Sequence, residues 1–215
     1  MGKDATIVSG SLNFVDGTPT FQTATFAVVG QGFIARDMGF RNIAGAAKHQ
    51  AVALMSTADH SVFYSRLPEL QHFTKKPMLG QQNTITAQGK IDPNQNTGIS
   101  IQNCTIGPAA NLSGVQTFLG RPWKNYSTTV FFHSQMGSLI DPKGWLPWVG
   151  TSAPDTIFYA EFQNTGPGSV IKNRVKWKGL KLNLSAAQVK KFTVGPFING
   201  DKWIPATGVS YKSGL

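Results

Sequence analysis

Phe132-His133-Ser134 and Phe162-Gln163-Asn164 belong to a set of five short phrases that recur along the chain at almost constant spacing. Each phrase is an apolar residue, then a polar one, then a small or polar one; the other three are Phe40-Arg41-Asn42, Leu70-Gln71-His72 and Ile101-Gln102-Asn103. The third residues of successive phrases lie 30, 31, 31 and 30 positions apart. A fixed period in this range is typical of a solenoid. The spacing therefore predicts a stack of coils.

A sixth phrase, Phe63-Tyr64-Ser65, breaks this period. It ends seven residues before His72, which is too short a step to close a coil that elsewhere takes about thirty residues. The sequence therefore predicts that a piece of the stack is missing near residues 66–70.

The composition is typical of a turn-rich β protein. The 215 residues include 23 glycines and 12 prolines, and only 14% of the residues are charged. Short β-branched and aromatic runs, such as Thr128 to Phe132, alternate with turn clusters such as Asp141-Pro142-Lys143-Gly144. A β-sandwich is an alternative for this pattern, but the constant period favours a β-helix. We expect one all-β domain over residues 1–215, incomplete at the junction near 66–70.

One short helix is predicted near the C-terminus. Ser185 and Gln188 form a capping box ahead of the apolar residues Val189 and Phe192. We expect this helix to pack on the coil stack and to shield apolar surface there.

The chain is strongly basic, with a formal net charge of +10. This charge favours a polyanionic partner, which can be nucleic acid, an acidic polysaccharide or an anionic surface. Basic residues alternate with other residues in one stretch: Lys172, Arg174, Lys176 and Lys178 flank Asn173, Val175 and Trp177. We interpret this stretch as a solvated strand face over a packed Trp177, because no recognised nucleic-acid module accompanies it. We therefore expect no nucleic-acid partner.

Other classes of protein are disfavoured by simple counts. No apolar run approaches the ~20 residues of a membrane span, so we expect no membrane partner. The opening residues lack the apolar core of a secretion signal. The single cysteine, Cys104, excludes an internal disulfide, and we interpret it as a small buried residue in a ladder between coils.

Three segments carry residues suited to chemistry. In Leu119-Gly120-Arg121-Pro122-Trp123, a guanidinium offers a rigid fork for a carboxylate and an indole offers a flat face for a sugar ring. In His49 to Leu54, the amide of Gln50 can donate to an oxyanion, although a structural role is the default. From Asn83 to Gly98, several amides can stack as a polar ladder.

Taken together, these segments resemble the catalytic domain of plant pectin methylesterases, the pectinesterase family. The resemblance covers nearly the whole chain and rests on Gly10-Ser11-Leu12-Asn13, Thr23 to Phe33, His49 to Leu54, Asn83 to Gly98, Leu119 to Trp123, Asn164-Thr165-Gly166, Arg174-Val175-Lys176-Trp177 and Pro205-Ala206-Thr207-Gly208. It implies a right-handed parallel β-helix that hydrolyses methyl esters of galacturonate in pectin (homogalacturonan), in the extracellular cell wall. It also implies that neither a metal nor a cofactor is needed.

The resemblance also implies roles for four residues. In the family, one aspartate attacks the ester, a second serves as general acid and base, and glutamine amides stabilise the oxyanion. Gln50 matches the first of these glutamines, Arg121 the arginine that holds the nucleophile, and Trp123 a sugar-stacking tryptophan. Ile43 stands where the family usually has a substrate-contacting threonine, so a hydroxyl is lost there.

The catalytic aspartates themselves have no match. The family motifs Tyr-Gln-Asp-Thr-Leu and Asp-Phe-Ile-Phe-Gly are absent, and both belong between Arg66 and Leu70. Glu69 is the only acidic residue near this junction, and one carboxylate cannot replace a nucleophile and a separate acid. The opening residues match a point well inside the family's domain. We therefore expect a truncated, inactive family member, monomeric if it folds; the alternatives are a protein that binds de-esterified pectin and a gene product without function.

Overall fold

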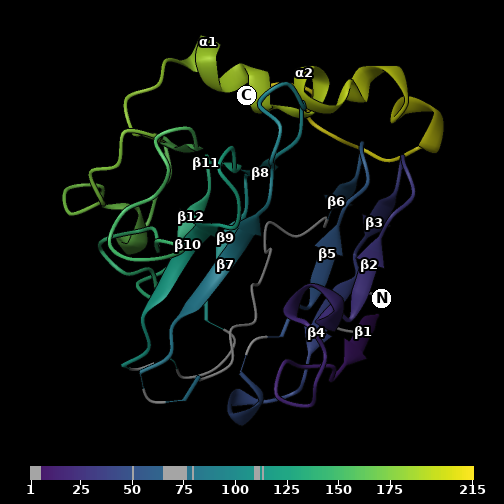
Figure 1. The fold of residues 1–215 in the computed structure, drawn as a ribbon. Helices are drawn as coiled ribbons and strands as arrows, with labels where there is room; N and C mark the ends of the chain where they lie inside the picture. Colours follow the sequence, from purple (N-terminus) through teal and green to yellow (C-terminus); the bar gives the residue numbers. More distant parts are fainter. Residues whose placement is uncertain (1–5, 50, 65–76, 79, 109–111, 113) are drawn as a thin grey trace.

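A computed structural model describes residues 6–49, 51–64, 77–78, 80–108, 112 and 114–215, and these form parallel coils (Figure 1). Every strand pairing among them is parallel. The strands are β1 (Ile7–Gly10), β2 (Phe26–Val28), β3 (Ile34–Arg36), β4 (Gly39–Asn42), β5 (Leu54–Ser56), β6 (Val62–Tyr64), β7 (Asn83–Gln88), β8 (Ile99–Gln102), β9 (Thr105–Ile106), β10 (Thr117–Pro122), β11 (Thr128–Phe132), β12 (Gln135–Met136), β13 (Phe158–Phe162) and β14 (Leu180–Lys181). The predicted parallel β-helix is confirmed.

The strands fall into two groups. In the N-terminal group, β1 pairs with β4, β2 with β5 and β3 with β6. In the C-terminal group, β7 pairs with β10 and β9 with β12, while β8, β11, β13 and β14 form a four-stranded sheet. Within the described residues, no strand pairing joins the two groups. The predicted junction near 66–70, the phrase Leu70-Gln71-His72 and Glu69 lie outside the described residues.

The coil length varies more than the sequence period suggested. Ile34 pairs with Val62, 28 residues further on, whereas Asn83 pairs with Thr117, 34 residues further on. In the four-stranded sheet the step is 30, because Gln102 pairs with Phe132. Our alignment of the phrases placed Ile101 at that position and was wrong by one residue.

Turn geometry explains the one-residue offset. Asn103, His133 and Gln163 each have a positive φ, at 54°, 53° and 47°, so these three residues occupy the same turn position in successive coils. The residues after the turns link the coils through the side chains of Ser134 and Asn164: the Ser134 amide donates to Asn164 Oδ1 at 2.9 Å, and the Cys104 amide donates to Ser134 Oγ at 3.2 Å. The stacked set is therefore Cys104, Ser134 and Asn164.

A buried ion pair lies inside the last coils. Glu161 is 4% exposed and takes the inward position that Phe131 fills in the preceding coil. Arg174, which is 5% exposed, binds both carboxylate oxygens of Glu161 through Nε at 2.8 Å and Nη2 at 2.9 Å. The indole of Trp145 donates to the same carboxylate at 3.0 Å. These bonds compensate the cost of burying a carboxylate.

The ion pair corrects our interpretation of the basic stretch at 172–178. This stretch is irregular backbone and not a strand, and Arg174 is buried in the core beside Glu161. Lys172, Lys176 and Lys178 are exposed, as expected. The alternation therefore reflects one buried cation among solvated ones.

The predicted helix is confirmed as α1 (Ala186–Val189). The Gln188 amide donates to Ser185 Oγ, and the Gln188 side chain reaches back to the Ser185 amide, as a capping box requires. A second helix, α2 (Val194–Ile198), follows. The segment covers the sheet of β8, β11 and β13: Val189 packs with Phe132 and Val130, and Ser100 donates to the Phe192 carbonyl at 2.6 Å. Short 3-10 turns occur at Thr20–Thr23, Ala46–Lys48, Pro167–Ser169, Lys190–Phe192, Gly200–Lys202 and Pro205–Thr207.

The C-terminal segment also reaches the N-terminal group of strands, as Figure 1 shows at the top of the view. The ring of Trp203 stacks on that of His60 with centroids 6.1 Å apart. A second contact joins the groups where the side chains of Gln81 and His49 lie 3.3 Å apart. No helix among the described residues is long and apolar enough to cross a membrane.

We predict that Glu161→Gln destabilises the protein by about 3–5 kcal/mol, because it leaves the Arg174 cation buried without a charged partner. Urea unfolding followed by circular dichroism measures the change. The double variant Glu161→Leu with Arg174→Met, which removes both charges, should be closer to the parent in stability. Asp155→Asn, which removes the exposed pair with Lys178, is the control and should leave the midpoint nearly unchanged. An unaltered midpoint for Glu161→Gln would contradict the prediction.

We also predict marginal stability and a tendency to associate. Within the described residues the two groups of strands share side-chain contacts but no strand pairing, and unpaired strand edges promote association. Differential scanning calorimetry and size-exclusion chromatography test this. A single cooperative transition together with a monomeric elution volume would contradict it.

Candidate functional site

Strand β10 positions Arg121. It pairs with β7, so that Arg121 lies beside Ala87 and Pro122 beside Gln88. Gly120 permits this close approach, because a Cβ there would collide with the Thr86 hydroxyl and lie 3.2 Å from the Trp145 ring. The strand ends at Pro122, which has no amide hydrogen to donate. The backbone of the Leu119 to Trp123 segment is therefore fixed by its neighbours.

The Arg121 guanidinium is held against Trp148. Its Nη2 donates to the Trp148 carbonyl at 2.8 Å, and its central carbon lies 4.9 Å from the centroid of the Trp148 ring. This is a cation–π geometry. Partial burial lowers the pKa of the guanidinium from its usual value, although an arginine stays charged at neutral pH. The side chain of Arg121 is thus oriented by a backbone acceptor and an aromatic face.

Two indoles form a corner beside this guanidinium. The rings of Trp123 and Trp148 meet edge to face at 81°, with centroids 5.9 Å apart. Trp148 is 46% exposed, so part of its ring is open to solvent. The structure therefore brings together two predicted residues, Arg121 and Trp123, and adds Trp148.

Sequence reasoning missed Trp148. It lies 25 residues after Trp123 in a loop, and the segment Trp145-Leu146-Pro147-Trp148 matched no motif that we used. The available signal was an aromatic residue after a proline, close to one coil length beyond Trp123. That signal identifies a residue one coil further along, but it does not reveal which way the ring points.

The other predicted site residues are not part of this group. Ile43 follows β4 in the N-terminal group of strands, is 53% exposed, and donates its amide to the Gly10 carbonyl at 2.7 Å. Gln50 lies outside the described residues. The predicted polar ladder is present in part, because Gln88 Oε1 accepts from the amides of Lys90 and Thr128, both at 2.9 Å. Gln88 therefore holds two coils together.

Two further titratable groups, the Cys104 thiol and the Tyr159 phenol, are largely buried and are poorly suited to catalysis. Burial raises the pKa of the Cys104 thiol to about 11, so it is protonated at neutral pH and a poor nucleophile, in line with our interpretation of it as a packed residue. Burial likewise raises the pKa of the Tyr159 phenol well above its usual value. The described residues contain no group of three or more His, Cys, Asp or Glu side chains that could hold a metal ion.

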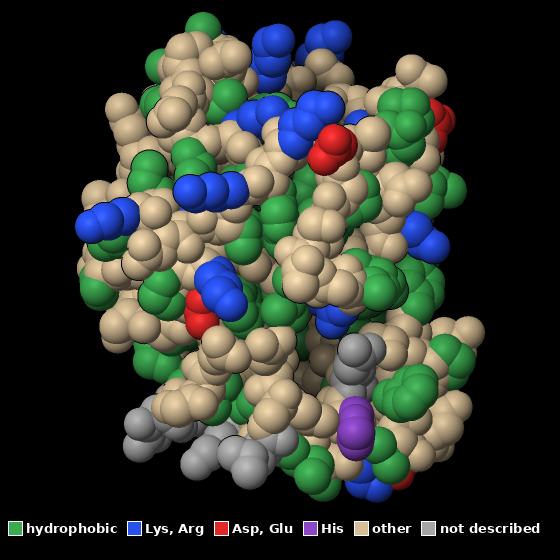
Figure 2. Space-filling view, turned by 60° about the vertical axis from the view of Figure 1, so that its left-hand side comes forward, with side chains coloured by type: hydrophobic (Ala, Val, Ile, Leu, Met, Phe, Trp, Pro, Cys, Tyr) green, Lys and Arg blue, Asp and Glu red, His purple; other side chains and the backbone are tan. Residues whose placement is uncertain are grey.

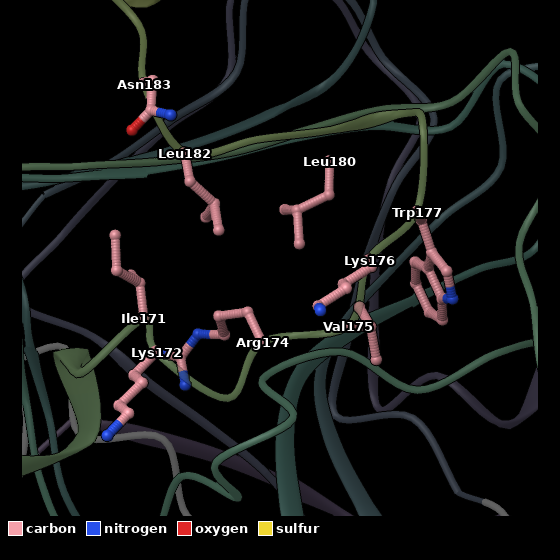
Figure 3. A pocket seen from close by; sticks show the side chains of 9 residues that line it. All are labelled: Ile171, Lys172, Arg174, Val175, Lys176, Trp177, Leu180, Leu182 and Asn183. Atoms are coloured by element: carbon pink, nitrogen blue, oxygen red, sulfur yellow. The ribbon is translucent and has the colours of Figure 1, made fainter.

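A pocket of about 290 Å³ lies elsewhere, before and along β14. It is lined by Ile171, Lys172, Arg174, Val175, Lys176, Trp177, Leu180, Leu182 and Asn183. Figure 3 shows Leu180 and Leu182 facing Arg174 and Lys176 across it. The charge of Arg174 is already neutralised by Glu161, and neither Arg121 nor Trp123 reaches this pocket. We therefore place the candidate site at Arg121.

The charge of the chain suits an acidic ligand. Figure 2 shows Lys and Arg side chains spread over one face of the molecule with few Asp or Glu side chains among them. At Arg121, a fork that can bind a carboxylate adjoins aromatic faces that can pack against a sugar ring. The arrangement can bind an acidic sugar. Among the described residues, no carboxylate is paired with Arg121, so this group of residues supplies no nucleophile.

Comparison with known proteins agrees with this geometry. The chain is 55% identical over 249 residues to "Probable pectinesterase/pectinesterase inhibitor 46" of Arabidopsis thaliana, covering 99% of this chain and 44% of that protein. The structure resembles a pectin methylesterase from carrot with a TM-score of 0.84 and 42% identity, covering all of this chain and 80% of that one. A pectin methylesterase in complex with a hexasaccharide shares the fold, with a TM-score of 0.62 and 15% identity, and the match covers all of this chain and 82% of that one.

These matches cover only part of the Arabidopsis relative, and the match to the family model is divided into two pieces. The chain spans less than half the length of the Arabidopsis relative. The alignment with that relative runs over 249 residues although the chain has 215, so at least 34 aligned positions have no counterpart here. The family model described as Pectinesterase matches in two pieces, residues 1–67 and 67–201, which meet at residue 67. On these matches, the chain belongs to the pectinesterase family.

Proposed function

We propose that this chain is a pectinesterase-family protein of the plant cell wall that no longer hydrolyses the methyl esters of pectin. The proposal rests on the hydrogen-bond partners of the Arg121 guanidinium. Its guanidinium donates to a backbone carbonyl, and no carboxylate is paired with it among the described residues. The resemblance implies that this arginine holds the nucleophilic aspartate of an active enzyme.

The sequence around the junction supports the loss of activity. From residue 60 to residue 91 the only acidic side chain is Glu69. The two pieces of the family match meet at residue 67, and the resemblance places the aspartate motifs between Arg66 and Leu70. Ester hydrolysis on this fold needs one carboxylate to attack the carbonyl carbon and expel methanol, and a second to protonate the leaving methoxide and activate water. Removal of catalytic groups that act as a unit can lower turnover by about a millionfold.

A second function, binding without hydrolysis, is favoured by the group formed by Arg121, Trp123 and Trp148. Arg121 and Trp123 each contact Trp148, and all three residues belong to the C-terminal part of the described chain. The net charge of +10 suits de-esterified pectin, whose galacturonate units are anionic. A gene product without function is the remaining alternative, and the stability measurements described above address it.

We predict that the purified chain releases no detectable methanol from highly esterified pectin, because the nucleophile and the acid are both missing. A variant with the two family motifs restored at the junction, in their family context, should release methanol. Methanol release is measured with an alcohol oxidase assay over a range of protein concentrations. Release by the unmodified chain that disappears in Glu69→Gln would overturn the proposal, because a single carboxylate would then be sufficient.

We predict that the chain binds polygalacturonate and that Trp123→Ala weakens this binding by about tenfold, which corresponds to the loss of about 1.4 kcal/mol of aromatic contact. The affinity should fall as salt is added, because part of the attraction is between exposed charges. Phe14→Ala, at an exposed aromatic residue in the N-terminal part, is the matched control and should bind as the parent does. Equal affinities of the parent and Trp123→Ala would count against a binding role for the group of Arg121, Trp123 and Trp148.

A further inference from the structure

Among the described residues, the guanidinium of Arg121 has more hydrogen-bond donors than acceptors that bind them. A guanidinium carries five N–H donors in a planar fork. One of them, on Nη2, is used by the Trp148 carbonyl, and Nε is buried without a hydrogen-bond partner among the described residues. The donors that remain on the two terminal nitrogens lie at the end of the fork, which is the part of the group that binds a carboxylate through two parallel bonds.

Two contacts with Trp148 and the register of β10 fix the position of this fork. Trp148 holds it through the carbonyl bond and through its ring, and β10 carries its Cα in a fixed register with β7. A fork that is already oriented loses little conformational entropy when it binds. The ring of Trp148 is half-exposed and stands at 81° to that of Trp123. A pyranose ring that packs in this corner brings a substituent on its edge close to the guanidinium.

We propose that Arg121 binds the free carboxylate of a galacturonate unit, so that this site selects the de-esterified form of pectin over the methyl-esterified form. The inference rests on the binding role under the proposed function and specifies its ligand. A free carboxylate has two equivalent oxygens that share a negative charge, and both accept from the fork. A methyl ester has no charge, and its methoxy oxygen is a poor acceptor. The ester therefore loses the second of the two parallel hydrogen bonds from the guanidinium, and no negative charge strengthens the first.

The overall charge of the chain offers a competing explanation, because any protein with a net charge of +10 prefers an anionic ligand. The two explanations differ in what they require of residue 121. Selection by a planar fork requires an arginine, whereas attraction by net charge is satisfied by any cation. Arg121→Lys therefore separates them, since it keeps the charge and removes the fork.

The experiment is calorimetric titration of the full chain with two oligogalacturonates of equal length, one fully de-esterified and one fully methyl-esterified, at a fixed moderate salt concentration. The parent should bind the acid form at least tenfold more tightly than the ester form. Arg121→Lys should lose most of this ratio. Trp123→Ala should weaken both affinities and leave the ratio unchanged. Lys176→Met, which removes one exposed cation at the separate pocket, should retain the ratio. Thermal melts confirm that each variant is folded.

Four results would overturn the inference. If Arg121→Lys keeps the parent ratio, the fork is not the selecting group. If Lys176→Met loses as much of the ratio as Arg121→Lys, net charge is the cause. If the parent binds both oligomers equally, the site binds the sugar but does not distinguish its carboxylate from the ester. The binding role then survives, and the inference fails. If the parent binds neither oligomer, the binding role fails and the inference with it.

Discussion

Parallel pairing of each strand with the equivalent strand of the next coil is the interaction on which the rest of this structure depends. The backbone amides and carbonyls of the strands in a β-helix find their partners in the next coil, so each coil needs a neighbour. The sheet of β8, β11, β13 and β14 meets this need over four successive strands. The N-terminal group meets it only in pairs. The stability of the molecule is therefore expected to be greatest around β11, where Val130, Phe131 and Phe132 are fully buried.

The interior of the C-terminal group is not uniformly apolar. Glu161 occupies an inward position of the stack, and its carboxylate is held by Arg174 and by the indole of Trp145. Arg174 also donates to the carbonyls of Pro142 and Gly168. A single buried cation thus anchors the irregular segments on both sides of β13. This network explains how a stretch without strands is held against the coils before β14.

The sequence allowed the coil stack and the C-terminal helix to be predicted, because a period and a capping box are local signals. Register was harder to predict. Ile101-Gln102-Asn103 and Phe132-His133-Ser134 look equivalent, yet the positive φ values align Asn103 with His133. Partners distant in sequence were not predictable: nothing in the residue types links Glu161 to Arg174. Of the candidate site, Arg121 and Trp123 were identified from one pentapeptide, whereas Trp148 depends on the path of a loop.

Under the proposed function, the placement of Arg121, Trp123 and Trp148 in the C-terminal part of the chain explains how binding outlasts hydrolysis. Among the described residues, the contacts that fix Arg121 come from the C-terminal group: the pairing of β10 with β7, the missing side chain at Gly120, and the carbonyl and ring of Trp148. None of these contacts involves the segment around residue 67, where the two pieces of the family match meet. A change at that junction can remove the reacting carboxylates and leave the fork in place. A partly buried guanidinium beside two indoles, with no carboxylate paired with it among the described residues, then has a carboxylate as its most favourable partner. Under our proposal, the absence of the catalytic carboxylates changes the preferred ligand of Arg121 from the ester to the acid.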